Sequence, residues 1–100
     1  SSKITVTQND LFLPESVSEI GELETAVFIK TEIPKANIYL NQIYQGKSPI
    51  KISNIIPGYY TLSVEFMQAK EQTVIKNFLI EIKSGELQNY YIPFSTANML

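Results

Sequence analysis

The 100-residue sequence contains no histidine, no cysteine, no tryptophan and no arginine. Without histidine there is no imidazole to act as a general base near neutral pH or to bind a metal. Without cysteine there is no disulfide, no thiolate metal site and no thiol nucleophile. Without arginine, and with a net charge of −2, the chain lacks the planar forks that recognise phosphates and guanine edges. These absences argue against catalysis, against a metal or other cofactor, and against binding to nucleic acid.

The remaining reactive residues form no recognisable catalytic pattern. Ser48 and Lys51 have S-x-x-K spacing, but that nucleophile belongs on a helix, whereas this segment is typical of a turn followed by a strand. Glu65 and Glu81 fall at outward positions of predicted strands, where carboxylates are normally solvated. No cluster of aspartates indicates a calcium loop. We therefore predict that the chain is not an enzyme.

Long hydrophobic runs are also missing. The longest apolar run is only a few residues, well short of the roughly 20 that span a bilayer. The lysines are scattered from Lys3 to Lys83 rather than gathered into a basic patch. This pattern predicts no direct insertion of the segment into a membrane.

What the sequence does have is a series of short β-type stretches. The chain is 44% hydrophobic and contains fourteen isoleucines. The clearest alternation places Tyr60, Leu62, Val64 and Phe66 on one face of a strand. Six or seven such stretches, separated by turn residues about every 8–12 positions, predict an all-β fold. We expect a small antiparallel β-sandwich of the immunoglobulin-like or prealbumin-like type.

The same alternation predicts the other residues that face the core. The inward sets are Val27 and Ile29, then Ile38 and Leu40, then Phe78, Ile80 and Ile82, and finally Tyr90, Ile92 and Phe94.

Glycine and proline mark the predicted turns, and five of them are assigned a structural role: Gly46, Pro49, Pro57, Gly58 and Gly85. Pro57-Gly58 suits a type II turn, in which glycine takes a positive φ. Asn41-Gln42 is predicted to be a hairpin tip. A positive φ at Gln42 would cost about 1 kcal/mol, so a different or longer turn is expected there.

The chain divides into three predicted parts. Residues 1–24 are expected to form an irregular linker or N-terminal extension, with weak periodicity around Pro14 and a short strand at residues 4–7 as an alternative. Residues 25–94 are expected to form the β-sandwich domain, with a polar tip from Gln68 to Gln72. Residues 95–100 are expected to be a frayed tail.

The order of turn and core residues from Pro34 to Phe94 resembles the PEGA domain family. Pro34 and Ala36 match its namesake segment, although Lys35-Ala36 replaces the usual E-G-A. Further matches are Ile38-Tyr39-Leu40 for V-Y-V, Gly46-x-Ser48-Pro49 for G-x-T-P, Pro57-Gly58-x-Tyr60-x-Leu62-x-Val64 for P-G-x-Y-x-L-x-V, and Ser84-Gly85-Glu86 at the late turn.

The resemblance implies a non-catalytic structural or interaction module of a larger exported or cell-envelope protein, with a spacer, assembly or adhesion role. It implies a location in the cell envelope, on the periplasmic or extracellular face. The expected partner is another protein or a cell-wall or surface glycan.

Tyrosine is the one residue type with binding potential, and three tyrosines are candidates: Tyr39, Tyr44 and Tyr59. Alternation directs Tyr39 and Tyr59 away from the core. Exposed aromatic rings can stack on sugars or anchor a protein interface, but tyrosine is also common on strands for its propensity alone. A carbohydrate-binding module is therefore one alternative function. An accessory domain of an enzyme or sensor encoded elsewhere in the same protein is the second.

Overall fold

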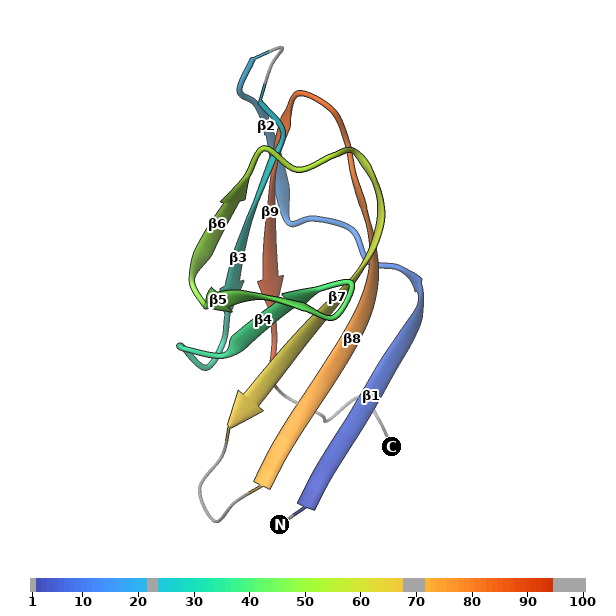
Figure 1. Ribbon diagram of the computed structural model, residues 1–100, viewed down its shortest axis with the longest axis vertical. Helices are drawn as coiled ribbons and strands as arrows, with labels where there is room; N and C mark the ends of the chain where they lie inside the picture. The colour runs from blue at the N-terminus through green and yellow to red at the C-terminus, as the bar shows by residue number, and fades with distance from the viewer. Residues whose placement is uncertain (1, 22–23, 68–71, 95–100) are drawn as a thin grey trace.

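The computed structural model describes residues 2–21, 24–67 and 72–94. These residues form two β-sheets that pack face to face (Figure 1). The nine strands of this described part are β1 (Ser2–Leu11), β2 (Ser16–Glu19), β3 (Ala26–Thr31), β4 (Asn37–Leu40), β5 (Ile43–Lys47), β6 (Ile50–Ser53), β7 (Gly58–Met67), β8 (Gln72–Ile82) and β9 (Glu86–Ile92). The predicted all-β sandwich is confirmed.

One sheet has five strands in the order β1-β8-β7-β4-β5, and the other has four in the order β2-β9-β3-β6. Most neighbouring strands are antiparallel, but β1 runs parallel to β8 and β3 runs parallel to β9. The longest ladder joins β7 to β8, with ten residue pairs from Gly58–Ile82 to Met67–Thr73.

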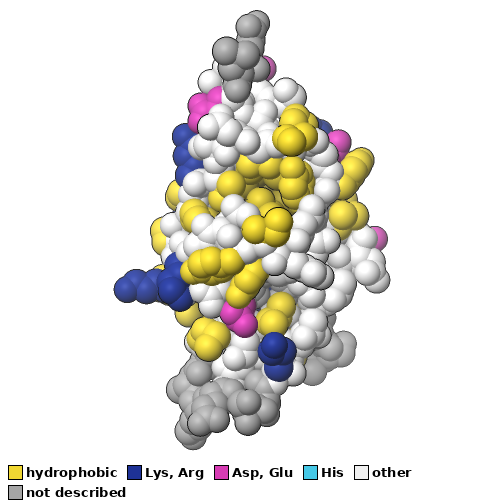
Figure 2. All heavy atoms as spheres, viewed as in Figure 1, with side chains coloured by type: hydrophobic (Ala, Val, Ile, Leu, Met, Phe, Trp, Pro, Cys, Tyr) yellow, Lys and Arg dark blue, Asp and Glu magenta, His cyan; other side chains and the backbone are white. Residues whose placement is uncertain are grey.

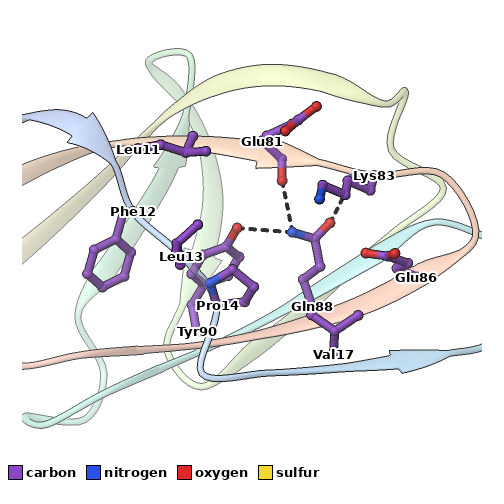
Figure 3. A pocket seen from close by; sticks show the side chains of 10 residues that line it. All are labelled: Leu11, Phe12, Leu13, Pro14, Val17, Glu81, Lys83, Glu86, Gln88 and Tyr90. Carbon is purple, nitrogen blue, oxygen red and sulfur yellow. Dashed lines mark hydrogen bonds between the residues drawn. The ribbon is translucent and has the colours of Figure 1, made fainter.

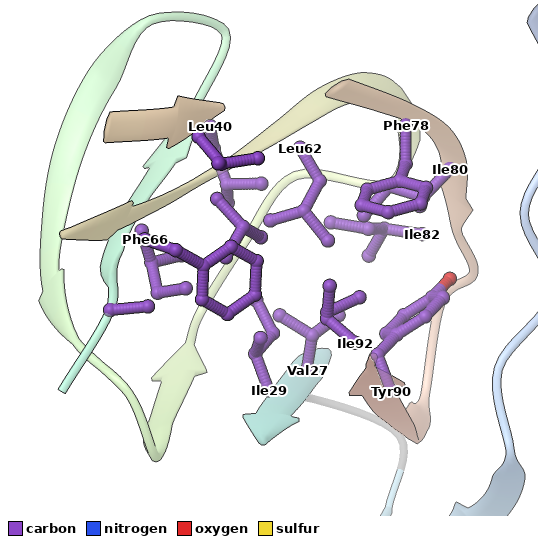
Figure 4. Close-up of a cluster of buried hydrophobic side chains, with 14 residues drawn as sticks. Val27, Ile29, Leu40, Leu62, Phe66, Phe78, Ile80, Ile82, Tyr90 and Ile92 are labelled. Carbon is purple, nitrogen blue, oxygen red and sulfur yellow. The ribbon is translucent and has the colours of Figure 1, made fainter. Parts of the chain in front are cut away.

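The core lies between the two sheets, as Figure 4 shows. Leu62, Val64 and Phe66 of β7 are completely buried. They face Val27 and Ile29 of β3, which are equally inaccessible to solvent. Apart from Phe94 and Tyr60, which pack against this core while partly buried, every residue predicted to face inward is buried. Alternation therefore predicted the core correctly, because each strand has one face toward the other sheet.

Two buried polar side chains in this core bind each other. Gln88 Nε2 donates to the Glu81 carbonyl oxygen (2.8 Å) and to the Tyr90 hydroxyl (3.2 Å), and Gln88 Oε1 accepts from the Lys83 amide (2.7 Å). Burial raises the pKa of Tyr90 to about 12. The phenol is therefore neutral at physiological pH, which suits its position inside the sandwich.

Lys76 lies on the inward face of β8 and is also buried. Its ammonium group donates to the Pro93 carbonyl oxygen (2.8 Å). Burial lowers the pKa of Lys76, and the nearby Glu32 carboxylate opposes that shift. Glu32 in turn accepts a hydrogen bond from the Phe94 amide (2.7 Å). Through these hydrogen bonds Pro93 and Phe94, which follow β9, are held against β8 of one sheet and against Glu32, which follows β3 of the other.

The prediction that residues 1–24 are irregular is wrong. The segment contains β1 and β2, and each strand adds to the edge of a different sheet. Among the side chains described from Lys3 to Leu11, all are exposed or half-buried. An edge strand held by backbone hydrogen bonds needs no buried face, so its sequence shows little hydrophobic alternation.

The crossing from β1 to β2 closes one side of the sandwich. The Phe12 amide donates to the Leu79 carbonyl oxygen (2.7 Å), and the Glu15 amide donates to that of Asn89 (2.6 Å). The Phe12 ring lies 4.5 Å from the Phe78 ring and 5.9 Å from the Tyr90 ring, centroid to centroid. Figure 3 shows this ring beside the chain as it passes from one sheet to the other.

Two predicted turns differ from the structure. Asn41 and Gln42 form a two-residue tip with φ values of +48° and +70°, so the expected different or longer turn is wrong. Asn41 offsets the cost: its Oδ1 accepts from the Thr61 amide, and its own amide donates to the Thr61 carbonyl oxygen, both at 2.9 Å. At Pro57-Gly58 the glycine has φ +150° and begins β7, whereas a type II turn requires about +80° there.

Two further predictions concern residues outside the described part of the chain. The predicted tail covers 95–100, and most of the predicted polar tip falls on 68–71.

Replacing Phe12 by alanine tests whether the N-terminal segment stabilises the sandwich. We expect Phe12→Ala to lower the free energy of unfolding by about 2 kcal/mol, because half-buried aromatic contacts with Phe78 and Tyr90 are lost. Leu13→Ala is the matched control, since Leu13 is 69% exposed and its loss should change stability by less than about 0.5 kcal/mol. Urea denaturation measures both, and equal stability of the two variants would show that the Phe12 contacts contribute nothing.

Candidate functional site

A single row of outward side chains crosses all five strands of the larger sheet. Tyr44 of β5 pairs with Tyr39 of β4, which pairs with Ser63 of β7. Ser63 pairs with Asn77 of β8, which pairs with Thr7 of β1. The row therefore has an aromatic half and a half made of hydroxyl and amide groups. At about 4.8 Å per strand it is on the order of 19 Å long. We call these five residues the cross-strand row.

The polar half of the cross-strand row is connected by its own hydrogen bonds. The Ser63 hydroxyl donates to Asn77 Oδ1 (2.6 Å), and Asn77 Nδ2 donates to the Thr7 hydroxyl (3.4 Å). The short bond from Ser63 orients the Asn77 amide.

The aromatic half is supported by the neighbouring row. The two tyrosine rings lie 5.5 Å apart at an angle of 60°. The Tyr39 hydroxyl donates to Glu65 Oε1 (3.3 Å), and the Tyr44 hydroxyl donates to Asn37 Oδ1 (3.4 Å). Asn37 Nδ2 also donates to Glu65 (2.9 Å), and the Lys47 ammonium donates to Asn37 (3.0 Å). Because both hydroxyls are held one row away, the rings lean along the sheet.

This environment changes the acidity of Tyr39. Partial burial raises the pKa of the Tyr39 phenol, and the charge of Glu65, the hydrogen bond to it and the proximity of Tyr44 raise the pKa further. The phenol therefore stays protonated and remains a hydrogen-bond donor to Glu65.

A shallow groove lies along the polar half of the cross-strand row. It has a volume of about 370 Å³ and is lined by Thr7, Asn41, Gln42, Thr61, Ser63 and Asn77. A second groove of about 230 Å³ continues it over Gln8, Asn9, Phe78 and Leu79. The first volume is within the usual range for small-molecule sites, although the groove is open to solvent. Among the described residues that line the two grooves there is no lysine, aspartate or glutamate.

The three candidate tyrosines are only partly brought together. Tyr39 and Tyr44 form a pair, whereas Tyr59 lies on the same face four residues before Ser63, about 13 Å along β7. Tyr59 is 64% exposed and pairs with Glu81. The outward directions predicted for Tyr39 and Tyr59 agree with the structure. Sequence reasoning missed Thr7, Ser63 and Asn77, because no aromatic or charged group distinguishes them.

The five predicted turn residues support the frame of the sheets. Gly46 sits at a bulge in β5 with φ +132°, and a Cβ there would lie 2.8 Å from Ile50 Cδ1. Pro49 follows a cis peptide bond, and Pro57 precedes the first residue of β7, Gly58. Gly85, with φ +74°, makes the turn between β8 and β9, where its amide donates to the Thr25 hydroxyl (3.0 Å).

Ser48 is a further structural position. Its buried hydroxyl accepts from the Ala36 amide (3.0 Å) and shares a hydrogen bond with the Thr31 hydroxyl (2.6 Å). The backbones also pair, through Ser48 to Ala36 (2.8 Å) and Lys35 to Ser48 (2.9 Å). Ser48 thus joins the two segments that carry the Pro34 and Pro49 motifs.

A pocket beside the β1–β2 crossing is much smaller than either groove. The pocket drawn in Figure 3, between the β1–β2 crossing and β8–β9, has a volume of about 60 Å³, too small for more than a few waters. Hydrophobic side chains gather on the face seen in Figure 2, over the β4–β5 hairpin and the β6–β7 connection. Ile43 and Ile56, 66% and 76% exposed, belong to these two segments.

The described ranges have neither a cluster of metal-ligating side chains nor a membrane-spanning helix. Over residues 2–21, 24–67 and 72–94, no three His, Cys, Asp or Glu side chains are grouped to hold a metal ion. The same ranges contain no helix with the length and apolar character needed to cross a membrane.

Comparison with protein families finds a match in the central part of the chain. Residues 24–70 match the PEGA domain family. This range, the PEGA segment, contains β3 to β7, and the match confirms the predicted resemblance within it. The predicted resemblance ran on to Phe94, whereas the match leaves out β8 and β9. PEGA domains are small modules found in exported and cell-envelope proteins. No curated protein and no solved structure matches the chain.

The link between Glu65 and Tyr39 can be tested by titration. We expect Glu65→Gln to lower the pKa of Tyr39 relative to the unmodified chain, because removal of the carboxylate charge makes the phenolate less unfavourable. The pH dependence of the Tyr39 ring carbon shifts measures this, and Glu86→Gln, at the start of β9, serves as the control. An unchanged or higher pKa in Glu65→Gln would contradict the assigned contact.

Proposed function

We propose that this chain is a non-catalytic interaction module of an exported or cell-envelope protein, located on the periplasmic or extracellular face. The PEGA segment supports the cellular setting, since PEGA domains occur in exported proteins. The tyrosine pair supports the interaction role, and it is the observation on which the proposal chiefly depends.

The tyrosine pair has the properties of a contact surface. Tyr44 is 52% exposed, and its ring lies against that of Tyr39. The contact between the rings and the long hydrogen bonds to Asn37 (3.4 Å) and Glu65 (3.3 Å) favour one orientation of both rings before any partner arrives. Binding to such a surface costs little side-chain entropy, which is why ordered tyrosines are frequent in interfaces. Solubility alone does not require that exposed tyrosine rings be held by such hydrogen bonds.

The partner in this proposal is a cell-wall or surface glycan or another envelope protein, and the role is adhesion or assembly rather than spacing alone. An accessory domain of an enzyme or sensor stays the alternative, because an interaction module can serve a catalytic neighbour through the same face.

Sedimentation with isolated envelopes tests the proposed function. The full 100-residue chain is mixed with envelopes from bacterial and archaeal cells and centrifuged. We expect the unmodified chain in the pellet and the double variant Tyr39→Ala/Tyr44→Ala mainly in the supernatant, because the contact surface is removed. Tyr91→Ala is the matched control, since Tyr91 lies in β9 of the other sheet and is 39% exposed.

Dispersed amide spectra establish that each variant is folded. The proposal fails if the unmodified chain stays in the supernatant with every envelope. It also fails if the folded double variant sediments as well as Tyr91→Ala.

A further inference from the structure

We propose that the cross-strand row and the groove beside it bind a neutral oligosaccharide that lies across the strands of the five-stranded sheet. This inference rests on the proposed function and assigns the chemical class of ligand. Three observations support it: the division of the row into two chemical halves, the absence of charge in the grooves, and the direction of the row.

The two halves of the row match the two kinds of surface that a sugar presents. Pyranose rings have apolar C–H faces that stack on aromatic rings and hydroxyl edges that form paired hydrogen bonds. Tyr39 and Tyr44 provide the aromatic surface, with ring centroids 5.5 Å apart. Next to them along the row, Ser63, Asn77 and Thr7 offer hydroxyl and amide groups. An amide both donates and accepts, as a sugar hydroxyl does.

The polar groups are already oriented toward one another. Asn77 Oδ1 accepts from Ser63, while its Nδ2 contact with Thr7 is long, at 3.4 Å. The amide therefore has hydrogen-bonding capacity left for a ligand hydroxyl. Asn41 and Gln42, at the positive-φ tip, contribute two further side-chain amides to the lining of the same groove.

The absence of charge selects a neutral ligand. The lining of the two grooves consists of serine, threonine, asparagine, glutamine, phenylalanine and leucine. A carboxylated or phosphorylated glycan would lose hydration there without gaining a cation. The nearest charges in the neighbouring row are engaged with Asn37: Lys47 donates to it, and it donates to Glu65. A neutral polyol has no such penalty.

The direction of the row favours a sugar over an extended peptide. Peptides that bind sheets usually add a strand at a free edge, where backbone groups are unpaired. The cross-strand row instead runs across the face, where β8, β7 and β4 each have partners on both sides. Only side chains are available for recognition on this surface. A flexible chain of hydroxylated rings can follow such a row.

The proposed site extends beyond the PEGA segment. Tyr39, Tyr44 and Ser63 lie within residues 24–70, whereas Thr7 and Asn77 come from β1 and β8 outside the match. The aromatic half therefore belongs to the matched family segment, and the polar half is completed by the flanking strands of this chain.

Titration of the isotopically labelled 100-residue chain tests the proposal. The probes are neutral tetrasaccharides, namely cellotetraose, mannotetraose and tetra-N-acetylchitotetraose, with tetragalacturonate as the anionic comparison. We expect at least one neutral probe to shift amide signals around Tyr39, Tyr44, Ser63 and Asn77, and to bind at least fivefold more tightly than tetragalacturonate.

Variants on the two sheets provide matched controls. Tyr39→Ala and Asn77→Ala should each weaken binding at least fivefold, and Ser63→Ala is a second polar variant if Asn77→Ala does not fold. Tyr91→Ala and Asn89→Ala, in β9 of the other sheet, should leave the affinity unchanged.

The inference is overturned if no neutral probe shifts these signals, if tetragalacturonate binds as tightly, or if the β9 variants weaken binding equally. Envelope binding that depends on the tyrosine pair, with no response to any neutral probe, would refute the ligand class and leave the proposed function standing. Binding of a neutral probe without envelope sedimentation would refute the proposed function instead.

Discussion

The ladder between β7 and β8 is the constraint on which the rest of the structure depends. Its ten pairs hold Leu62, Val64 and Phe66 in the core and, by the same alternation, turn Thr61, Ser63 and Glu65 outward. A shift of one residue in this register would turn Thr61, Ser63 and Glu65 toward the core and Leu62, Val64 and Phe66 toward solvent. The strength of the core therefore also fixes the outer surface. Ser63 lies beside Asn77 and Tyr39 because Leu62 and Val64 cannot lie anywhere but between the sheets.

The predictable part of this molecule is the part governed by burial. Val27, Ile38 and Ile80 were placed correctly because alternation reports which face is hidden from water. The pairing of β1 and β2 with the sandwich was not predicted, since both lie at sheet edges and their partners β8 and β9 are more than sixty residues away in sequence. The two-residue turn at Asn41-Gln42 was also not predicted. The φ preferences of the two residues disfavour it, and the hydrogen bonds between Asn41 and Thr61 that stabilise it cannot be read from the local sequence. In β1, β2 and the Asn41-Gln42 tip alike, contacts with residues distant in sequence determine the structure.

The candidate site was only half predictable for a related reason. Tyr39 and Tyr44 could be selected from the sequence because aromatic side chains exposed to solvent are suited to contact with a ligand or partner. Thr7, Ser63 and Asn77 are ordinary surface residues individually, and they gain meaning only through the register that aligns them. The PEGA segment contributes β4, β5 and β7 to the five-stranded sheet, and β8 and β1 extend that sheet beyond β7. Turn residues such as Ser48 and Gly85 maintain this frame, which leaves the outer side chains available for binding.

The most direct measurement is the detection of intermolecular nuclear Overhauser effects between a bound neutral tetrasaccharide and the labelled chain. The proposed site predicts contacts from sugar C–H protons to the rings of Tyr39 or Tyr44, together with contacts to the Asn77 side-chain amide. Contacts confined to Tyr91 and its neighbours in β9, or contacts spread evenly over the surface, would contradict it.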